Sequence, residues 1–181
     1  MSALTEKSLR TRRLIASAIC LALALVLPFL TGQIQQIGNM LCPMHIPVLL
    51  CGLICGWPWG VAVGFIAPLL RFVLFGMPPI YPIGLAMAFE LATYGFSAGL
   101  SYKILPKKAV YVYAALLCGM IDGRIVWGIT RYIMAGLDGG TFPFSAFLAG
   151  AVTNAIPGII LHIVLIPPIV LALKKAKLFY N

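Results

Sequence analysis

Five charged residues lie inside stretches of sequence that are otherwise apolar. They are Arg71, Glu90, Asp122, Arg124 and Arg131. If those stretches cross a membrane, each charge costs at least ~2.5 kcal/mol at the bilayer centre, so each is a candidate for function. Arginine binds carboxylate and phosphate groups through paired hydrogen bonds. Two or three arginines against one glutamate therefore favour recognition of a small anionic or zwitterionic molecule.

The composition places these residues in a membrane protein. The chain has 181 residues, of which 62% are apolar and 9% charged, and its mean hydropathy is +1.04. About a quarter of the residues in a soluble domain are charged. The balance found here excludes a soluble globular enzyme, a disordered segment and a disulfide-stapled secreted domain. It predicts an all-α membrane protein in which residues 1–181 form a single domain.

Apolar stretches predict six transmembrane helices in a compact bundle. As a helix, the second stretch reaches only ~22 Å, which is short of the ~30 Å hydrocarbon core. This shortness suggests an irregular site on the outer side of the membrane. The six stretches cover residues 14–31, 43–57, 59–76, 80–101, 109–135 and 144–173.

The basic residues decide between five and six spans. Ten of the thirteen fall within residues 7–13, 103–108 and 174–177, in short flanks of the apolar stretches. Lys and Arg in such flanks mark the cytoplasmic side. Six spans place all three clusters and both termini in the cytoplasm, whereas five would put the middle cluster outside. The net charge of +9 therefore indicates how the chain is oriented in the membrane, and no nucleic-acid partner is expected.

Helix geometry predicts that polar residues from three spans share one depth. At a rise of ~1.5 Å per residue, Glu90 and Asn154 each lie ~15 Å into their spans. Arg124 lies ~22 Å from the cytoplasmic end of its own span, which runs the other way. All three therefore sit near or just above the midplane of the membrane.

Helical phase predicts which neighbours face the same way. Tyr94 lies one turn from Glu90, and the two fall within ~40° of each other at 100° per residue. Trp127 and Arg131 follow Arg124 at the i+3 and i+7 positions of one face. These two faces predict a ligand pocket between the spans. The simpler alternative is an ion pair of Glu90 that holds the bundle together, although such pairs seldom add net stability.

The remaining intramembrane residues allow other readings. Asp122 points ~160° away from Arg124, so it is expected to face another helix. Arg71 lies ~7 Å below the outer end of its span, where a long side chain can reach the headgroups. The sequence leaves open whether Asp122 and His162 are structural or functional.

A polar segment at residues 32–45 follows the first span on the predicted outer face. It contains Asn39 and His45 among several glutamines. It is either a solvated connector or a loop that covers the pocket. The candidate substrate-binding residues are thus Asn39, His45, Arg71, Glu90, Tyr94, Arg124, Trp127, Arg131 and Asn154; no metal ligands or catalytic residues are assigned.

Taken together, these features resemble the substrate-binding S component of an energy-coupling factor (ECF) vitamin transporter. The resemblance rests on the six-span chain with a basic N-terminus, the alanine-rich first span, the polar loop after it and the block MHIPVLLCG…GFIAPLLR at 44–71. It implies high-affinity capture of a vitamin-like molecule from outside the cell membrane. Ala18 and Ala22, a spacing that lets helices approach closely, would dock on the transmembrane coupling subunit.

The resemblance also implies how transport is driven. Two partner ATPases would use ATP and make the S component topple to release its cargo inside, while this chain itself holds no cofactor and does no covalent chemistry. Consistent with that, the sequence contains no Walker motif. Pantothenate fits an arginine-rich pocket. Alternatives are another vitamin, a nucleobase-like queuosine precursor that uses Glu90 and Trp127, or, in another class, a small intramembrane enzyme that uses Glu90 and Asp122.

Overall fold

The computed structural model describes residues 3–31 and 34–178, and all regular elements in this part of the chain are helices, without strands. The side chain of Asn39 lies outside the described residues. The helices run along the chain as follows: α1 (Ala3–Val26), α2 (Gln35–Leu41), α3 (His45–Cys55), α4 (Trp57–Phe75), α5 (Leu85–Ile104), α6 (Ala109–Leu137), α7 (Phe144–Ala151) and α8 (Ile156–Lys175).

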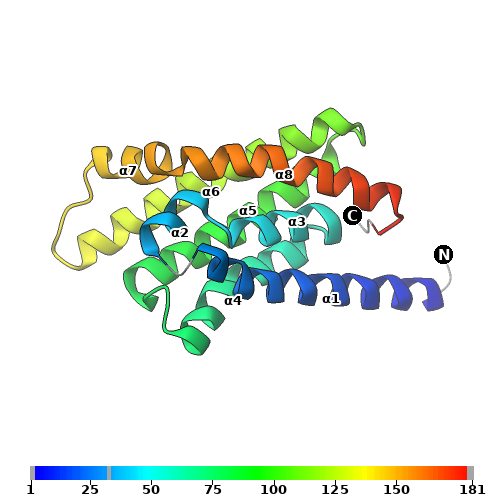
Figure 1. The fold of residues 1–181 in the computed structure, drawn as a ribbon, viewed down its shortest axis with the longest axis horizontal. Helices are drawn as coiled ribbons and strands as arrows, with labels where there is room; N and C mark the ends of the chain where they lie inside the picture. Colours follow the sequence, from blue (N-terminus) through cyan, green and yellow to red (C-terminus); the bar gives the residue numbers. More distant parts are fainter. Residues whose placement is uncertain (1–2, 32–33, 179–181) are drawn as a thin grey trace.

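Short irregular turns extend or join several of these helices. A 3₁₀ turn, Leu27–Thr31, continues α1, and a π turn, Ile80–Gly84, precedes α5 with a kink at Tyr81. A second 3₁₀ turn, Thr153–Ala155, separates α7 from α8. Both chain ends lie at one end of the bundle, together with the α5–α6 connection, whereas α2 and α7 lie toward the other end (Figure 1).

Five helical segments in the described residues are long and apolar enough to cross a membrane. They cover residues 6–30, 57–75, 80–104, 109–137 and 144–175. The prediction of an all-helical membrane protein is therefore confirmed, whereas the count of six spans is not. The predicted second span, 43–57, corresponds to α3, which has 11 residues, all of them buried. Because α1, α4, α5 and α8 surround it, α3 does not have to match the thickness of the bilayer.

The structure adds detail to two local expectations from the sequence. The segment 32–45 is not merely a solvated connector, because its described part contains helix α2, which packs against α8 and the turn before it. The predicted last span, 144–173, lies within a helical segment, 144–175, that is apolar enough to cross a membrane, but a 3₁₀ turn interrupts it between α7 and α8. Gly158 explains part of this arrangement. A Cβ atom there would lie 2.6 Å from the carbonyl oxygen of Met40, so only glycine lets α2 rest on α8.

Glycines bring α3, α4 and α5 into backbone contact. A Cβ atom on Gly52 would lie 2.5 Å from the carbonyl oxygen of Gly95, and one on Gly60 would lie 2.8 Å from the same atom. A Cβ on Gly64 would overlap with the carbonyl of Leu91. Close approach of this kind replaces side-chain packing by direct backbone packing. It fixes the position of α5, which carries Glu90, against α3 and α4.

Candidate functional site

A cavity of about 310 Å³ lies in the half of the bundle that contains α2 and α7. This volume is at the small end of the range for ligand pockets. Its wall is mostly apolar, with a few charged side chains. The residues around it are Pro28, Ile34, Gly38, Cys42, Pro43, Met44, His45, Arg71, Met77, Pro78, Ile83, Met87, Glu90, Arg124, Trp127, Arg131, Gly150 and Asn154.

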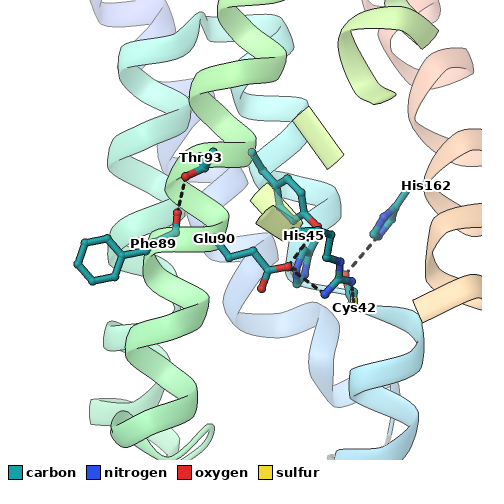
Figure 2. A network of polar contacts seen from close by, with 8 residues as sticks. Cys42, His45, Phe89, Glu90, Thr93 and His162 are labelled. Carbon is teal, nitrogen blue, oxygen red and sulfur yellow. Dashed lines mark hydrogen bonds and ion pairs between the residues drawn. The ribbon is translucent and has the colours of Figure 1, made fainter. Parts of the chain in front are cut away.

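Glu90 is the buried centre of the polar network in this cavity (Figure 2). Its Oε1 atom lies 3.0 Å from Nη1 of Arg124 and 3.4 Å from Nε2 of His45. The Tyr94 hydroxyl donates a hydrogen bond of 3.1 Å to the same oxygen. Removing a carboxylate from water is costly unless it is paired and hydrogen-bonded. Three partners from α3, α5 and α6 meet that requirement here.

Cys42 connects this network to α2. Nη2 of Arg124 lies 3.4 Å from the Cys42 sulfur, to which it donates. Nε2 of His162, on α8, lies 3.3 Å from the Cys42 carbonyl oxygen. Burial raises the pKa of the Cys42 thiol, although Arg124 opposes the shift. Because Cys42 directly follows α2, these contacts tie the end of α2 to α6 and to α8.

Arg71 does not reach out to the headgroups, as one reading of the sequence suggested. Only 3% of its surface is exposed, and its Nη1 donates a hydrogen bond to the carbonyl oxygen of Leu25. Its guanidinium lies 4.9 Å from the centre of the Phe29 ring and 5.2 Å from that of Phe75. These contacts hold Arg71 against α1 while it lines the cavity.

Arg131 and Trp127 form an aromatic wall with the segment before α7. The guanidinium of Arg131 lies 5.7 Å from the centre of the Phe142 ring. The Trp127 ring meets Phe142 edge-on at 5.9 Å and Phe147 at 6.4 Å between ring centres. Gly150 lies against Trp127, where a Cβ atom would come within 2.5 Å of the indole.

The structure brings seven of the nine predicted binding residues to one cavity; Tyr94 is outside its lining, and the side chain of Asn39 is outside the described part of the chain. Tyr94 is absent from the lining of the cavity as described, because it lies behind Glu90 and bonds to it. For Asn39 only the backbone, within α2, is described. The predicted residues that line the cavity are His45, Arg71, Glu90, Arg124, Trp127, Arg131 and Asn154.

Asp122 lies apart from this cavity. Its carboxylate is largely exposed and accepts a hydrogen bond from Ser97 on α5. It faces a neighbouring helix, as helical phase predicts, and it does not line the cavity in the described part of the chain. Glu90 and Asp122 thus belong to different surroundings.

Sequence reasoning overlooked some of the cavity residues. Cys42, Met77 and Met87 line the cavity, although none of them is among the binding residues that the sequence predicts. The aromatic partners Phe142 and Phe147 were not singled out either. A signal was available for Cys42, because it lies in the polar segment next to His45. The contact of Trp127 with residues after α6 had no local signal.

The described part of the chain is thus a bundle of helices, five of them long and apolar enough to cross a membrane, with a cavity that is lined in part by charged side chains. The family model described as "ECF transporter, substrate-specific component" matches residues 12–170. The chain therefore belongs to the family of substrate-specific components of ECF transporters. Searches among curated proteins and among solved structures found no match.

Membership of this family sets the general role of the protein. It is a multi-pass protein of the cell membrane and the substrate-binding subunit of an ECF importer. It works together with a transmembrane coupling subunit and ATPase subunits. Members of the family are transporter subunits and not enzymes, which argues against the alternative of an intramembrane enzyme.

Proposed function

We propose that this S component captures a small anionic or zwitterionic vitamin-like molecule, such as pantothenate, in the cavity around Glu90. The observation that carries the proposal is the surplus of positive charge there. Three arginines and one glutamate line the cavity, and the glutamate is paired with only one of the arginines, Arg124. Arg71 and Arg131 have no carboxylate partner among the described residues, so they are suited to bind an acidic group of the cargo.

The acidic residues elsewhere leave this surplus uncompensated. The chain has four acidic residues in all. Asp122 accepts from Ser97, and Asp138 accepts a 2.8 Å hydrogen bond from Tyr81. Glu6 belongs to the first turn of α1, and this N-terminal end of α1 lies at the opposite end of the bundle from α2 and α7 (Figure 1). A bound anion is therefore the natural counter-charge for Arg71 and Arg131.

A nucleobase-like cargo, such as a queuosine precursor, is the second candidate. It is supported by the ring of Trp127, which lines the cavity and offers a stacking surface. In this alternative Glu90 accepts hydrogen bonds from ring or exocyclic N–H groups. The two candidates differ in the charge of the molecule that the protein retains.

We also propose the topology and the docking surface. Both chain ends and the α5–α6 connection, with their basic flanks, lie at one end of the bundle (Figure 1), which favours a cytoplasmic location for that end. In this arrangement α3 counts as a short sixth helix and the cavity lies toward the outside. Ala18 and Ala22 are exposed on α1, so the helix surface there is free to approach the coupling subunit. Docking would then drive toppling and release.

Mass spectrometry of small molecules tests the binding proposal. The chain is purified alone in mild detergent, exposed to a mixture of water-soluble vitamins, washed and denatured. We expect one acidic or zwitterionic compound in near-equimolar amount. Retention of a purely cationic compound, or of none, would contradict the proposal.

A separate experiment tests docking. The Ala18→Trp and Ala22→Trp variants are coexpressed with a coupling module, and the Ile121→Trp variant serves as the control, because Ile121 is 59% exposed on α6. The alanine variants should bind cargo normally but lose copurification and uptake. Unchanged uptake in both would show that α1 does not dock through this face.

A further inference from the structure

The two oxygens of the Glu90 carboxylate have different surroundings. Arg124, His45 and Tyr94 all contact Oε1. Among the described residues no partner is recorded for Oε2, which points away from the three contacts in Figure 2. Glu90 lines the cavity. Some buried polar atoms have neither a hydrogen-bond partner nor access to solvent, and Oε2 is not one of them. This oxygen is therefore an acceptor that is open to a bound molecule.

The charge around Oε2 favours a particular kind of group. Arg124 and Glu90 form a pair whose formal charges cancel, so the site of Oε2 does not need a full counter-charge. Oε2 needs a hydrogen-bond donor, because a poorly solvated carboxylate oxygen without a donor raises the free energy of the folded protein. An N–H, O–H or ammonium group of the cargo would supply one.

The unpaired arginines lie at a different level of the same cavity. Gly60 and Gly64 on α4 contact Gly95 and Leu91 on α5. This antiparallel register puts Arg71 level with residue 84, six residues before Glu90. At ~1.5 Å per residue, Arg71 is therefore ~9 Å from Glu90 along the bundle axis.

The same reasoning places Arg131. Gly119 and Gly123 on α6 contact Ala98 and Tyr94 on α5. Arg131 is then level with residue 86, which is ~6 Å from Glu90 along the axis. The helix positions of both arginines that lack a carboxylate partner among the described residues are thus displaced from Glu90 in the same direction, toward the turn between α4 and α5.

We infer that the cavity is bipolar and selects a cargo that carries both a hydrogen-bond donor and a separate anionic group. The donor binds Oε2 of Glu90, and the anionic group binds between Arg71 and Arg131, roughly 6–9 Å away along the axis. Tyr94 and His45 act as positioning residues that hold Oε1. This inference rests on the proposed binding function and narrows its substrate class. It excludes simple monocarboxylic acids and permanent cations.

A binding panel tests this inference. Wild-type protein in lipid nanodiscs is incubated with amino acids, water-soluble vitamins and donor-free monocarboxylic acids at equal concentrations, and retained compounds are identified by mass spectrometry. Retention of a compound with both groups supports the bipolar cavity. Retention of a donor-free acid overturns it but leaves the proposed binding function intact. If nothing is retained, the binding function fails and the inference fails with it.

Two variants test the role of Oε2 with the retained compound. In Glu90→Gln the amide oxygen is expected to take the place of Oε1, beside the Arg124 guanidinium and the Tyr94 hydroxyl. The NH₂ group then replaces the open acceptor. Affinity should fall at least about tenfold, the loss expected for a hydrogen bond to a charged group. Asp122→Asn makes the same carboxylate-to-amide change outside the cavity lining, so its affinity should not change.

These variants also separate a binding role from a structural one. Both must elute as monodisperse protein before their affinities are compared. If Glu90→Gln binds as tightly as wild type, Oε2 does not contact the cargo and the inference is wrong. If Glu90→Gln does not fold, the chemical identity of the compound retained by wild type decides the question by itself.

Discussion

The two sides of the cavity are built in different ways. On one side α3, α4 and α5 meet through glycines, with backbone against backbone at Gly52, Gly60, Gly64 and Gly95. On the other side α6 and α7 meet through large side chains, such as Trp127 against Phe147. Backbone contact leaves no rotamers to rearrange, whereas aromatic side chains can be exchanged or reoriented. The glycine side therefore provides a fixed frame, and the aromatic side is where selectivity can change.

Substitutions on the glycine side should destabilise the protein more than substitutions on the aromatic side. In Gly95→Leu the new side chain would overlap with the backbone of Gly60, which cannot move without separating α4 from α5. We expect a loss larger than the ~1–3 kcal/mol typical of overpacked cores, so that little monodisperse protein is recovered. Yield and thermal unfolding in detergent measure this effect.

Gly136→Leu is the matched control for this substitution. Gly136 is also helical, but nothing lies within 4 Å of the position of its Cβ atom. Its variant should unfold at nearly the wild-type temperature. Equal behaviour of the two variants would mean that the glycine contacts do not define a rigid frame.

The Arg124–Glu90 pair connects the frame to the other side, and breaking it should have the next largest effect. Arg124→Ala leaves Glu90 as a buried carboxylate without its guanidinium partner. Removing one member of a buried pair costs ~3–5 kcal/mol, so both stability and cargo binding should fall. Thermal unfolding and equilibrium binding are the measurements.

A double variant shows whether the charge is the cause. Arg124→Ala combined with Glu90→Gln removes both charges, and it should recover much of the stability without recovering binding. If the double variant is no more stable than Arg124→Ala alone, the loss comes from packing and the Cys42 contact, not from the unpaired carboxylate.

Substitution of Arg131, on the aromatic side, should affect cargo binding more than stability. Arg131→Ala removes a half-buried guanidinium that contacts Phe142 and has no carboxylate partner among the described residues. We expect affinity for the acidic cargo to fall about 10- to 100-fold, as for a lost hydrogen bond to a charged group. Isothermal titration in nanodiscs measures it.

The conservative variant refines that result. Arg131→Lys keeps the charge but cannot bind a carboxylate through two parallel hydrogen bonds. It should bind more weakly than wild type and more tightly than Arg131→Ala. If Arg131→Ala binds cargo normally while Arg71→Ala abolishes binding, the anionic group of the cargo contacts only the glycine side, at Arg71.

The sequence was informative wherever local geometry was sufficient. Rise per residue and helical phase put Glu90 and Arg124 at one depth, and the structure has them 3.0 Å apart. Phase could not separate a residue that lines the cavity from one just behind it, because Tyr94 and Glu90 share a face. It also gave no hint that Arg71 would be enclosed by Phe29, from the turn after α1, and by Phe75, from the end of α4.

Features that depend on contacts between distant segments were not predictable. Helix α2 rests on Gly158, and Cys42 is joined to Arg124 and His162 across large sequence separations. No periodicity within residues 32–45 encodes those partners. The break between α7 and α8 was missed for a related reason, since a uniformly apolar stretch looks the same whether its helix is continuous or interrupted.

Asp122 should show the smallest effect, and it tests where the binding site ends. Its carboxylate is exposed and accepts one hydrogen bond from Ser97, beside α5 but outside the cavity lining. Asp122→Asn keeps an oxygen that can accept this bond, so stability should change by less than ~1 kcal/mol and cargo affinity should not change. Equilibrium binding and thermal unfolding, with Arg131→Ala as the comparison, check both expectations. A tenfold loss of affinity in Asp122→Asn would extend the site along the α5–α6 interface, and the fixed frame would then take part in recognition well beyond Glu90.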